Sequence, residues 1–239
     1  MSLIGKRIVL VGGTSGIGLA TAEAAAREGA QVVVASRRRA SVDGALARLP
    51  EDAEGHVLDV TSEEQVRDVF HRIGAFDHLV FTAGETLLVE ELAVASVERA
   101  RRFLDIRLWG AYTAVKYGSP AIREGGSIVL TTGVAGRRPH KGFTAAASLC
   151  GAMEALTRAL AVELAPIRVN VVSPGVVRTD LWSDMPEADR DAMYKAMAET
   201  LPAGRVGEPD DIAETYLYLM RGGFSTGSVV IVDGGTVLV

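Results

Sequence analysis

The segment Arg7-Ile-Val-Leu-Val-Gly-Gly-Thr-Ser-Gly-Ile-Gly18 begins as an apolar run and ends in a turn that carries glycine at positions 12, 16 and 18. An alanine-rich stretch of helical period follows directly. A strand, a glycine-rich turn and a helix in this order favour a phosphate site over a plain connection, because the free N–H groups and the positive dipole end of the helix meet at the turn. Its candidate residues are Gly12, Thr14, Ser15, Gly16, Ile17 and Gly18.

Apolar runs of strand length recur along the whole chain, and segments of helical period separate them. The runs are Arg7–Val11, Gln31–Ala35, Gly55–Leu58, Asp77–Thr82, Ser127–Thr132, Ile167–Val172 and Ser228–Val232. Most are apolar nearly throughout, which is typical of strands covered on both faces, and the intervening helices imply right-handed crossovers. We therefore expect an α/β fold with a Rossmann-like, doubly wound parallel sheet of about seven strands.

Helix punctuation supports this division. Gly29 follows the first helical segment, and Ser62 and Gln65 have the spacing of a capping box. The longest helix is predicted from Thr144 to about Leu164, before Pro166. A polar stretch at about 180–208 is predicted to be a mobile flap of short helices. Since no linker or repeat divides the chain, we expect residues 1–239 to form one domain.

Composition excludes several functions. The formal charge is −5 and the one basic cluster, Arg37-Arg38-Arg39, is short, so we expect no nucleic-acid partner. We find no run of about 18 apolar residues and no secretory leader at the N-terminus, so we expect no membrane span and a cytoplasmic location. Cys150 is the only cysteine, and His56, His71 and His78 are scattered, so no metal site is expected.

The end of the second apolar run indicates which dinucleotide would bind. An NAD-binding fold places a carboxylate here to hold the ribose hydroxyls, whereas this chain has Ser36, Arg37 and Arg38. Serine and arginine suit a 2′-phosphate, which an acid would repel, so NADP(H) is expected. The alternative is that the arginines are a solvated helix start; this fits Arg39, and Arg38 is open to both interpretations.

The spacing Gly12-x3-Gly16-x-Gly18 resembles the glycine pattern of the short-chain dehydrogenase/reductase family, and further motifs agree along the chain. They are Leu58-Asp59-Val60, Thr82-Ala83-Gly84, Ser173-Pro174-Gly175 with Val177 and Thr179, and Val232-Asp-Gly-Gly235. The resemblance implies contacts to adenine from Asp59 and Val60, and to the rest of the dinucleotide from Ala83, Gly84, Pro174, Gly175, Val177 and Thr179.

The same resemblance implies a serine and a tyrosine on the substrate oxygen, a lysine that lowers the pKa of the tyrosine, and an asparagine that organises a water relay. Aligned on Ala146-Ala-Ser-Leu-Cys150, the tyrosine and lysine positions hold alanine and cysteine. Gly133 stands at the serine position and Arg107 at the asparagine position. No tyrosine occurs between Tyr117 and Tyr194, so ordinary carbonyl reduction by the family mechanism is not expected.

Other residues could replace this machinery. Arg107 could stabilise an oxyanion or form a structural ion pair, and His140 could transfer protons or be a solvated loop residue. A gap in the alignment would offer the Thr132 hydroxyl. Cys150 is expected to be a small core side chain. Trp182 could cover a ligand or anchor the flap.

We therefore expect an NADP(H)-dependent oxidoreductase that acts on a small carbonyl or alcohol by an atypical mechanism. The alternative is an inactive relative that binds NADP(H) or a small ligand as a sensor. A non-redox enzyme that uses the nucleotide pocket fits less well. The resemblance also implies a homo-oligomer, a tetramer or a dimer, formed through the helix from Thr144 and the helix that contains Arg107.

Overall fold

The strand Arg7–Val11 (β1) lies in the middle of a parallel sheet in the computed structural model, which describes residues 2–239. It pairs with Gln31–Ser36 (β2) on one side and Phe76–Phe81 (β4) on the other. The remaining strands are Glu54–Val57 (β3), Ile122–Thr131 (β5), Arg168–Pro174 (β6) and Val229–Val232 (β7). Within residues 2–239 the sheet has seven strands in the order β3-β2-β1-β4-β5-β6-β7, all parallel. The predicted Rossmann-like α/β fold is confirmed.

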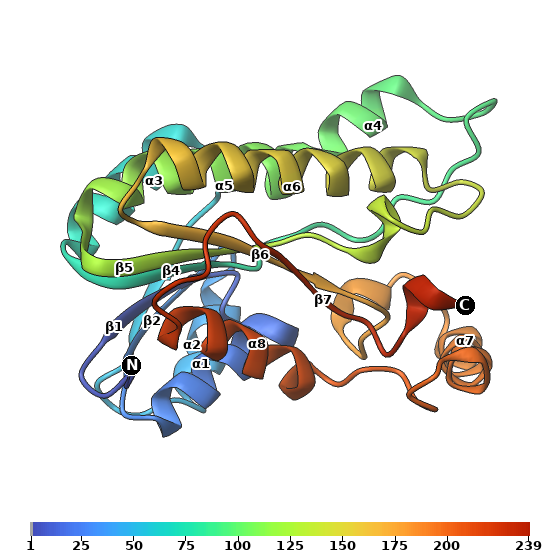
Figure 1. Ribbon diagram of the computed structural model, residues 1–239. Helices are drawn as coiled ribbons and strands as arrows, with labels where there is room; N and C mark the ends of the chain where they lie inside the picture. The colour runs from blue at the N-terminus through green and yellow to red at the C-terminus, as the bar shows by residue number, and fades with distance from the viewer. Residues whose placement is uncertain (1) are drawn as a thin grey trace.

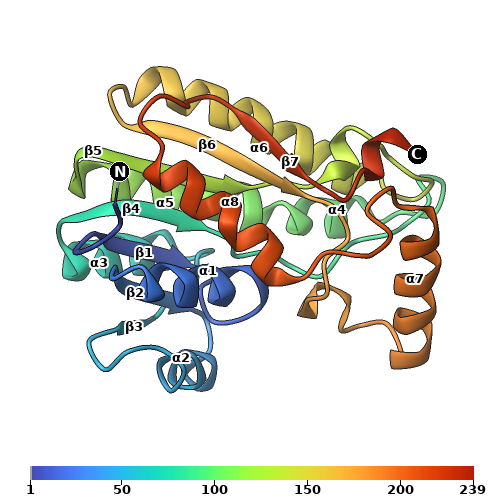
Figure 2. The same ribbon diagram turned by 60° about the horizontal axis from the view of Figure 1, so that its bottom comes forward.

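Helices cover both faces of this sheet, as Figures 1 and 2 show. One face carries α3 (Glu63–Ile73), α5 (Ala111–Gly118) and α6 (Thr144–Glu163). The other face carries α1 (Gly16–Arg27), α2 (Arg39–Leu46) and α8 (Pro209–Arg221). Each face has its own apolar core, because successive strand residues point to opposite sides: Val9 and Val33 pack toward α3, whereas Leu10 and Val34 pack toward α1.

The helix ends follow the signals in the sequence. Gly29 adopts a φ of +82° just after α1, where residues other than glycine are strained. At the start of α3 the Ser62 hydroxyl accepts a hydrogen bond from the Gln65 amide, as the capping spacing predicts. In a complete capping box the Gln65 side chain would accept a hydrogen bond from the Ser62 amide. Here it accepts one from the Asp59 amide instead.

The longest helix, α6, begins and ends within a residue of its predicted bounds. Its length and its mean hydropathy of 1.3 would be sufficient to cross a membrane, and among the described residues it alone meets both conditions. The face that carries Ala146, Leu149 and Met153 is buried against the sheet. A helix in a protein core has the same composition, so this property is weak evidence for a membrane span.

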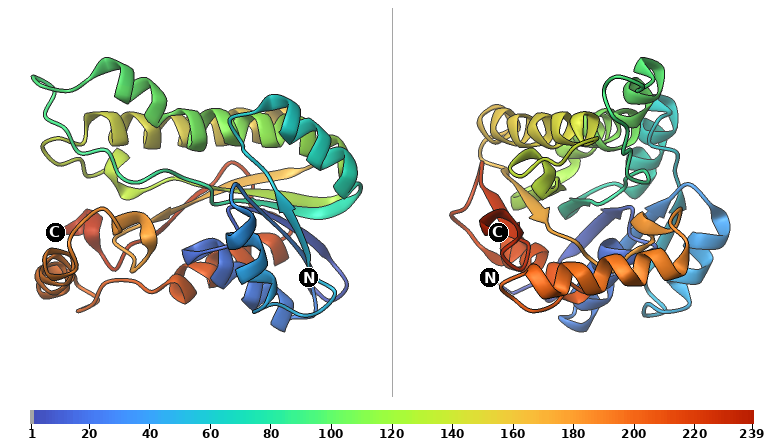
Figure 3. Two further views of the ribbon diagram at one scale, coloured as in Figure 1. Left: turned by 180° about the vertical axis from the view of Figure 1, so that it is seen from behind. Right: turned by 90° about the vertical axis from the view of Figure 1, so that its right-hand side faces the viewer.

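Two segments differ from the sequence prediction. Strand β5 begins at Ile122, five residues before the predicted Ser127, and its pairing with β4 shifts register between Phe76 and His78. The flap contains a short turn, η4 (Asp180–Trp182), and one helix of 14 residues, α7 (Glu187–Thr200), instead of several short helices. In Figure 3, α7 lies beside the C-terminal end of the chain, beyond the layer that α1 and α8 form.

A third segment connects β4 to α5. It includes the helix α4 (Val97–Phe103) and a turn of π-helix, η1 (Asp105–Gly110), which runs directly into α5. In Figure 1, α4 and the loop before it extend beyond the helical layer that α6 forms. Because η1 lies at the end of β4 next to α6, the side chains of η1 can reach the space at the carboxyl ends of the strands.

Candidate functional site

A cavity of about 560 Å³ opens at the carboxyl ends of the strands. From β1 the chain moves outward to β2 and β3 and then crosses to β4 on the other side, so the strand order reverses beside β1. Parallel sheets leave a crevice at such a reversal, since the connections on its two sides leave in opposite directions. The last residues of β1, β2, β5 and β6 line the cavity, and so does Thr82, which directly follows β4.

The glycine-rich turn has the geometry that its sequence predicts. Gly12 adopts a φ of +90°, and a Cβ there would lie 2.3 Å from the backbone nitrogen of Ala83. A Cβ on Gly18 would lie 2.2 Å from the carbonyl oxygen of Gly12 and 2.4 Å from the Thr82 hydroxyl. The turn, the start of α1 and the end of β4 therefore pack closely only because these residues have no side chains.

Helix α1 presents its N-terminus to this cavity. Its N-cap residue, Ser15, makes no side-chain cap hydrogen bond, and the first turn carries no acid. The first backbone amides of the helix therefore point into the cavity together with the positive end of the helix dipole. Gly16, at the first position, faces Thr179 from the loop after β6, which closes this part of the cavity. An anion such as a pyrophosphate fits this arrangement.

The opposite end of the cavity is lined by the residues after β2 and β3. Ser36, Arg37 and Arg38 lie there, and the two arginines are exposed. Arg38 makes no ion pair with any described residue, whereas Arg39 points away and pairs with Asp43 in α2. The hydrogen bond from the Thr61 hydroxyl lowers the pKa of Asp59, and the charge of Arg37 adds to this effect. This end therefore carries net positive charge at neutral pH.

All the residues singled out from the sequence for cofactor binding line this one cavity. They are Gly12, Thr14, Ser15, Gly16, Ile17, Gly18, Ser36, Arg37, Arg38, Asp59, Val60, Ala83, Gly84, Pro174, Gly175, Val177 and Thr179. They come from five separate connections at the ends of β1, β2, β3, β4 and β6. The candidates Arg107, Thr132 and His140 line it as well.

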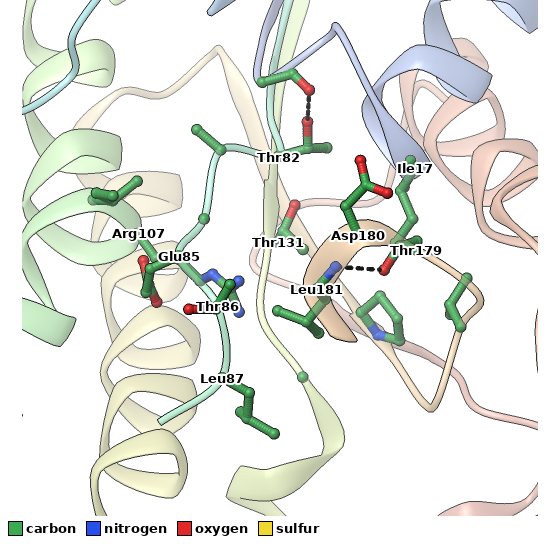
Figure 4. Close-up of a pocket in the computed structure, with 18 of the residues that line it drawn as sticks. Ile17, Thr82, Glu85, Thr86, Leu87, Arg107, Thr131, Thr179, Asp180 and Leu181 are labelled. Atoms are coloured by element: carbon green, nitrogen blue, oxygen red, sulfur yellow. Dashed lines mark hydrogen bonds between the residues drawn. The ribbon is translucent and has the colours of Figure 1, made fainter. Parts of the chain in front are cut away.

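Arg107 reaches the centre of the cavity from η1. Its guanidinium covers Gly84, where a Cβ would lie 2.2 Å from an Nη atom. Within residues 2–239 the guanidinium forms no ion pair or hydrogen bond, and its Nε is buried without a partner. The structural ion pair considered for this residue is therefore not formed among those residues. Figure 4 shows Arg107 together with Glu85 and Thr86 beside the end of β4.

The hydroxyl groups at the end of β5 are already engaged. Thr131 donates to the Phe81 carbonyl oxygen, at 2.6 Å, and its oxygen lies 2.6 Å from the buried Tyr216 hydroxyl, which donates to it. Thr132 donates to the Cys150 carbonyl oxygen, at 3.1 Å, and is buried. For Thr132 to protonate a ligand, this hydrogen bond would have to break first.

The mouth of the cavity is formed by a loop and by the flap. His140 is exposed at the rim, where its ring packs edge-on against Phe143. From the flap, Trp182 and the α7 residues Met193 and Met197 line the opposite wall. The indole of Trp182 donates to the Val177 carbonyl oxygen, at 3.0 Å, so Trp182 both anchors the flap and contributes to the cavity.

Comparisons with known proteins agree with this architecture. A family model described as enoyl-(acyl carrier protein) reductase matches residues 11–237. The short-chain dehydrogenase/reductase ATR9 of Stachybotrys chlorohalonatus is 36% identical over 250 residues, which is 98% of each chain. The chain belongs to the short-chain dehydrogenase/reductase family.

Two solved structures of short-chain dehydrogenases are informative. One, a small-chain dehydrogenase in complex with NADPH, is 37% identical, has a TM-score of 0.84 and covers 98% of this chain and 100% of its own. The other is a short-chain oxidoreductase from Pseudomonas aeruginosa PAO1 with an atypical catalytic center. It is 25% identical, has a TM-score of 0.89 and covers 98% of both chains.

In this short-chain dehydrogenase/reductase the wall beside Arg107 consists of small and apolar side chains. Ala146 and Cys150 on α6 are 3% and 4% exposed, and both line the cavity together with Gly133. The Cys150 sulfur would lie 3.5 Å from a Cβ on Gly133. Among the described residues that line the cavity there is no tyrosine, lysine or asparagine.

Three charged residues that line the cavity were not singled out from the sequence: Glu85, Arg138 and Asp180. Glu85 is the one among them with a buried, unpaired side chain. Both of its carboxylate oxygens are buried without a hydrogen bond of normal geometry. Burial raises the pKa of Glu85, although the positive charge of Arg107 opposes this shift. Glu85 could have been added to the candidates from the sequence, because it directly follows Gly84, which was already predicted to lie in the site.

Proposed function

We propose that this chain is an NADP(H)-dependent oxidoreductase that acts on a small carbonyl or alcohol, with proton handling that does not use a tyrosine–lysine dyad. The observation that carries this proposal is a single cavity. It extends from the arginines after β2, past the N-terminus of α1, to the guanidinium of Arg107. A dinucleotide phosphate and a substrate oxygen each have a matching partner in this space.

The residues present fit NADP(H). The close packing of Gly12 and Gly18 creates a cradle that a Cβ would fill, and the uncapped start of α1 suits a pyrophosphate. No acid lies at the end of β2, where Ser36 and Arg37 could instead hold a 2′-phosphate. The similar small-chain dehydrogenase in complex with NADPH supports this preference.

When bound, the nicotinamide supplies or accepts a hydride, so the substrate oxygen must be stabilised as it becomes an alkoxide. Arg107 can do this electrostatically, because its guanidinium has no competing hydrogen bond among the described residues. Arginine is a poor proton donor. The proton would come from His140 at the rim, from Thr132 after its bond to Cys150 breaks, or from solvent.

The missing dyad is part of the same proposal. Ala146, Cys150 and Gly133 occupy the cavity wall where the resemblance implies tyrosine, lysine and serine. Loss of general-acid assistance costs about 10²- to 10⁴-fold in rate, so a slow or substrate-assisted reaction is expected. The P. aeruginosa oxidoreductase with an atypical catalytic center supports the idea that this fold accommodates such a change.

The alternative is a binding module that senses NADP(H) or a small ligand without turnover. The same apolar wall favours it, because no described residue in direct contact with the cavity has the chemistry of the family's tyrosine and lysine. The two functions differ in one measurable respect. A sensor would bind NADPH tightly and show no change in nicotinamide absorbance with any carbonyl or alcohol.

Cofactor preference can be tested by NADPH and NADH fluorescence titrations. Arg37→Ala should lower the affinity for NADPH by roughly 10- to 100-fold through loss of a charge-assisted hydrogen bond, and should leave NADH binding unchanged. Arg39→Ala is the matched control, because Arg39 is excluded from the cavity and pairs with Asp43. Equal affinity of the wild type for both cofactors, unchanged by Arg37→Ala, would refute the NADP(H) assignment.

Turnover can be tested with a panel of small carbonyl compounds and alcohols at the nicotinamide absorbance. Arg107→Ala should reduce kcat by about 10²- to 10³-fold if the guanidinium stabilises the oxyanion. His140→Ala should reduce it only if the rim histidine delivers the proton. Turnover that neither variant changes would remove both residues from the mechanism, and tight NADPH binding without turnover would favour the sensor.

We also propose that the chain acts in the cytoplasm and self-associates through α5 and α6. The exposed Trp109 and Tyr112 support the interface, since they are 56% and 49% exposed and pack edge-to-face at the start of α5. Sedimentation of the wild type beside Trp109→Ser with Tyr112→Ser tests the assembly. A monomeric wild type, or a double variant that assembles as the wild type does, would count against it.

A further inference from the structure

Two acids of the cavity wall, Glu85 and Asp180, have no part in the proposed reaction, and of the two only Glu85 has buried carboxylate oxygens. It follows Gly84 at the end of β4, and its side chain lies beside η1. Both carboxylate oxygens are shielded from solvent and make no hydrogen bond of normal geometry. A buried carboxylate in this state is costly unless a nearby positive charge compensates it. The residue therefore depends on its charged neighbours.

Arg107 is the neighbouring cation that favours the ionised form of Glu85. The backbone amides of Glu85 and Arg107 act in the same direction, and Asp105 acts against it. On its other side Glu85 shares a smaller hollow with three charged residues: Arg99 and Arg102 of α4 and Asp184 of the flap. Arg99 forms an ion pair with Glu90, and Arg102 forms one with Glu98. The charges of these two arginines are therefore already compensated by acids other than Glu85.

The guanidinium of Arg107 has the complementary property. The side chain of Arg107 is held over Gly84 without an ion pair or hydrogen bond to any described residue, and its Nε is buried. The surrounding wall is apolar, with Leu87, Phe103 and Leu149. A planar cation in a largely apolar pocket binds a carboxylate far better than it binds a neutral group, because two parallel N–H···O bonds form where water is scarce.

We propose that Arg107 binds a carboxylate of the ligand, and that Glu85 is a positioning residue that competes with this carboxylate for the Arg107 charge, so that the ligand binds together with a proton on Glu85. This inference rests on the proposed function for its place in the reaction, and it names the substrate class: a small carbonyl or alcohol compound that carries a carboxylate. A bidentate carboxylate takes two of the five guanidinium N–H donors, so the reacting oxygen of the same ligand can use another. The net charge around Arg107 does not change on binding, because the ligand brings one carboxylate and the Glu85 carboxylate is neutralised by a proton.

The electrostatics of Glu85 support this coupling. Burial already raises its pKa, and a second carboxylate near Arg107 raises it further, since two like charges would share one cation. Above the pKa of Glu85, binding must therefore be accompanied by proton uptake. Linkage predicts that affinity for a carboxylate falls by about tenfold for each pH unit in that range.

The experiment measures binding of benzoate, with neutral benzamide as its matched probe, by titration calorimetry between about pH 5 and pH 8. Both the apo protein and the NADP-loaded protein are used. In the wild type, benzoate should bind more tightly at low pH and take up as much as one proton, measured from two buffers of different ionisation enthalpy. Benzamide should bind with no pH dependence.

Variants assign the effect to its residues. Glu85→Gln should bind benzoate with the same affinity at every pH, and Arg107→Met should weaken benzoate at least tenfold at low pH while Arg107→Lys restores part of the affinity. Glu91→Gln is the control, because Glu91 is an exposed acid of the same segment that pairs with Lys141. His140→Ala is measured in parallel, since the imidazole at the rim is another group of the cavity that can take up a proton.

Several results would overturn the proposal. They are equal binding of benzoate and benzamide by the wild type, an unchanged benzoate affinity in Arg107→Met, and a pH dependence that survives Glu85→Gln but disappears in His140→Ala. The outcome is separable from that of the proposed function. NADPH titration and turnover decide the oxidoreductase, whereas proton-linked benzoate binding to the apo protein decides the role of the two residues.

Discussion

The substitution Gly18→Ala tests the close packing on which the nucleotide cradle depends. The added Cβ would lie 2.2 Å from the carbonyl oxygen of Gly12 and 2.4 Å from the Thr82 hydroxyl, both too close for real contacts. The Thr82 hydroxyl donates to that same carbonyl oxygen, at 3.1 Å. The backbone of the turn and the start of α1 would have to separate, and this hydrogen bond would be lost.

The magnitude follows from three contributions. Overpacking a tight site costs about 1–3 kcal/mol, and the lost hydrogen bond costs about 1 kcal/mol. Replacement of glycine by alanine within a helix returns about 1 kcal/mol. The net loss in unfolding free energy is then about 1–3 kcal/mol, which lowers Tm by roughly 2–12 °C for a chain of this length.

Gly44→Ala is the matched control, because Gly44 lies inside α2 and a Cβ there meets nothing within 4 Å. It should raise stability by about 0.5–1 kcal/mol. Urea unfolding and NADPH titration of both variants are compared with the wild type, and Gly18→Ala should also weaken NADPH. A Gly18→Ala protein as stable as Gly44→Ala, with unchanged NADPH affinity, would refute the argument from close packing.

Two further predictions concern the core. Burial lowers the pKa of His78 to about 4 from 6.5, so the unfolded chain binds the extra proton and stability falls as pH decreases. Urea unfolding should therefore show that the protein is about 2 kcal/mol less stable at pH 5 than at pH 7. His78→Gln should remove most of this difference, and a difference that is the same in the variant as in the wild type would contradict the prediction. Tyr216→Phe removes the hydrogen bond to Thr131 and should cost about 1 kcal/mol; no change in Tm would show that this bond contributes nothing.

The sequence was sufficient for the central strands and insufficient where pairing depends on distant residues. The run Arg7–Val11 is apolar, bounded by a basic residue and a glycine turn, and becomes a strand with those bounds. The first half of β5, Ile122–Gly126, carries charged and glycine residues and resembles a loop. It pairs as a strand because Ile122 lies against Phe76, beyond the register shift. Local composition cannot reveal such a pairing.

The same distinction applies to the cavity. Glycine-rich turns and loop motifs are local signals, so the residues that they single out could be found from their order in the chain. The helix α7 was harder, because Tyr194 is its only buried residue among mostly polar neighbours and its periodic signal is weak. The burial of Glu85 depends on η1, which is about 20 residues later in the chain, and its position beside a glycine gives no indication of the charge that it would meet.

The contact between Arg107 and Gly84 has a consequence for protein engineering. Because the guanidinium occupies the volume that a side chain at position 84 would need, the two positions form one steric unit. An alanine at 84 would be accommodated only if the guanidinium of residue 107 moved aside or residue 107 were shortened. A redesign that introduces tyrosine at 146 and lysine at 150 would have to consider residue 107 as well, since its cation lines the same cavity as the new lysine and would repel it.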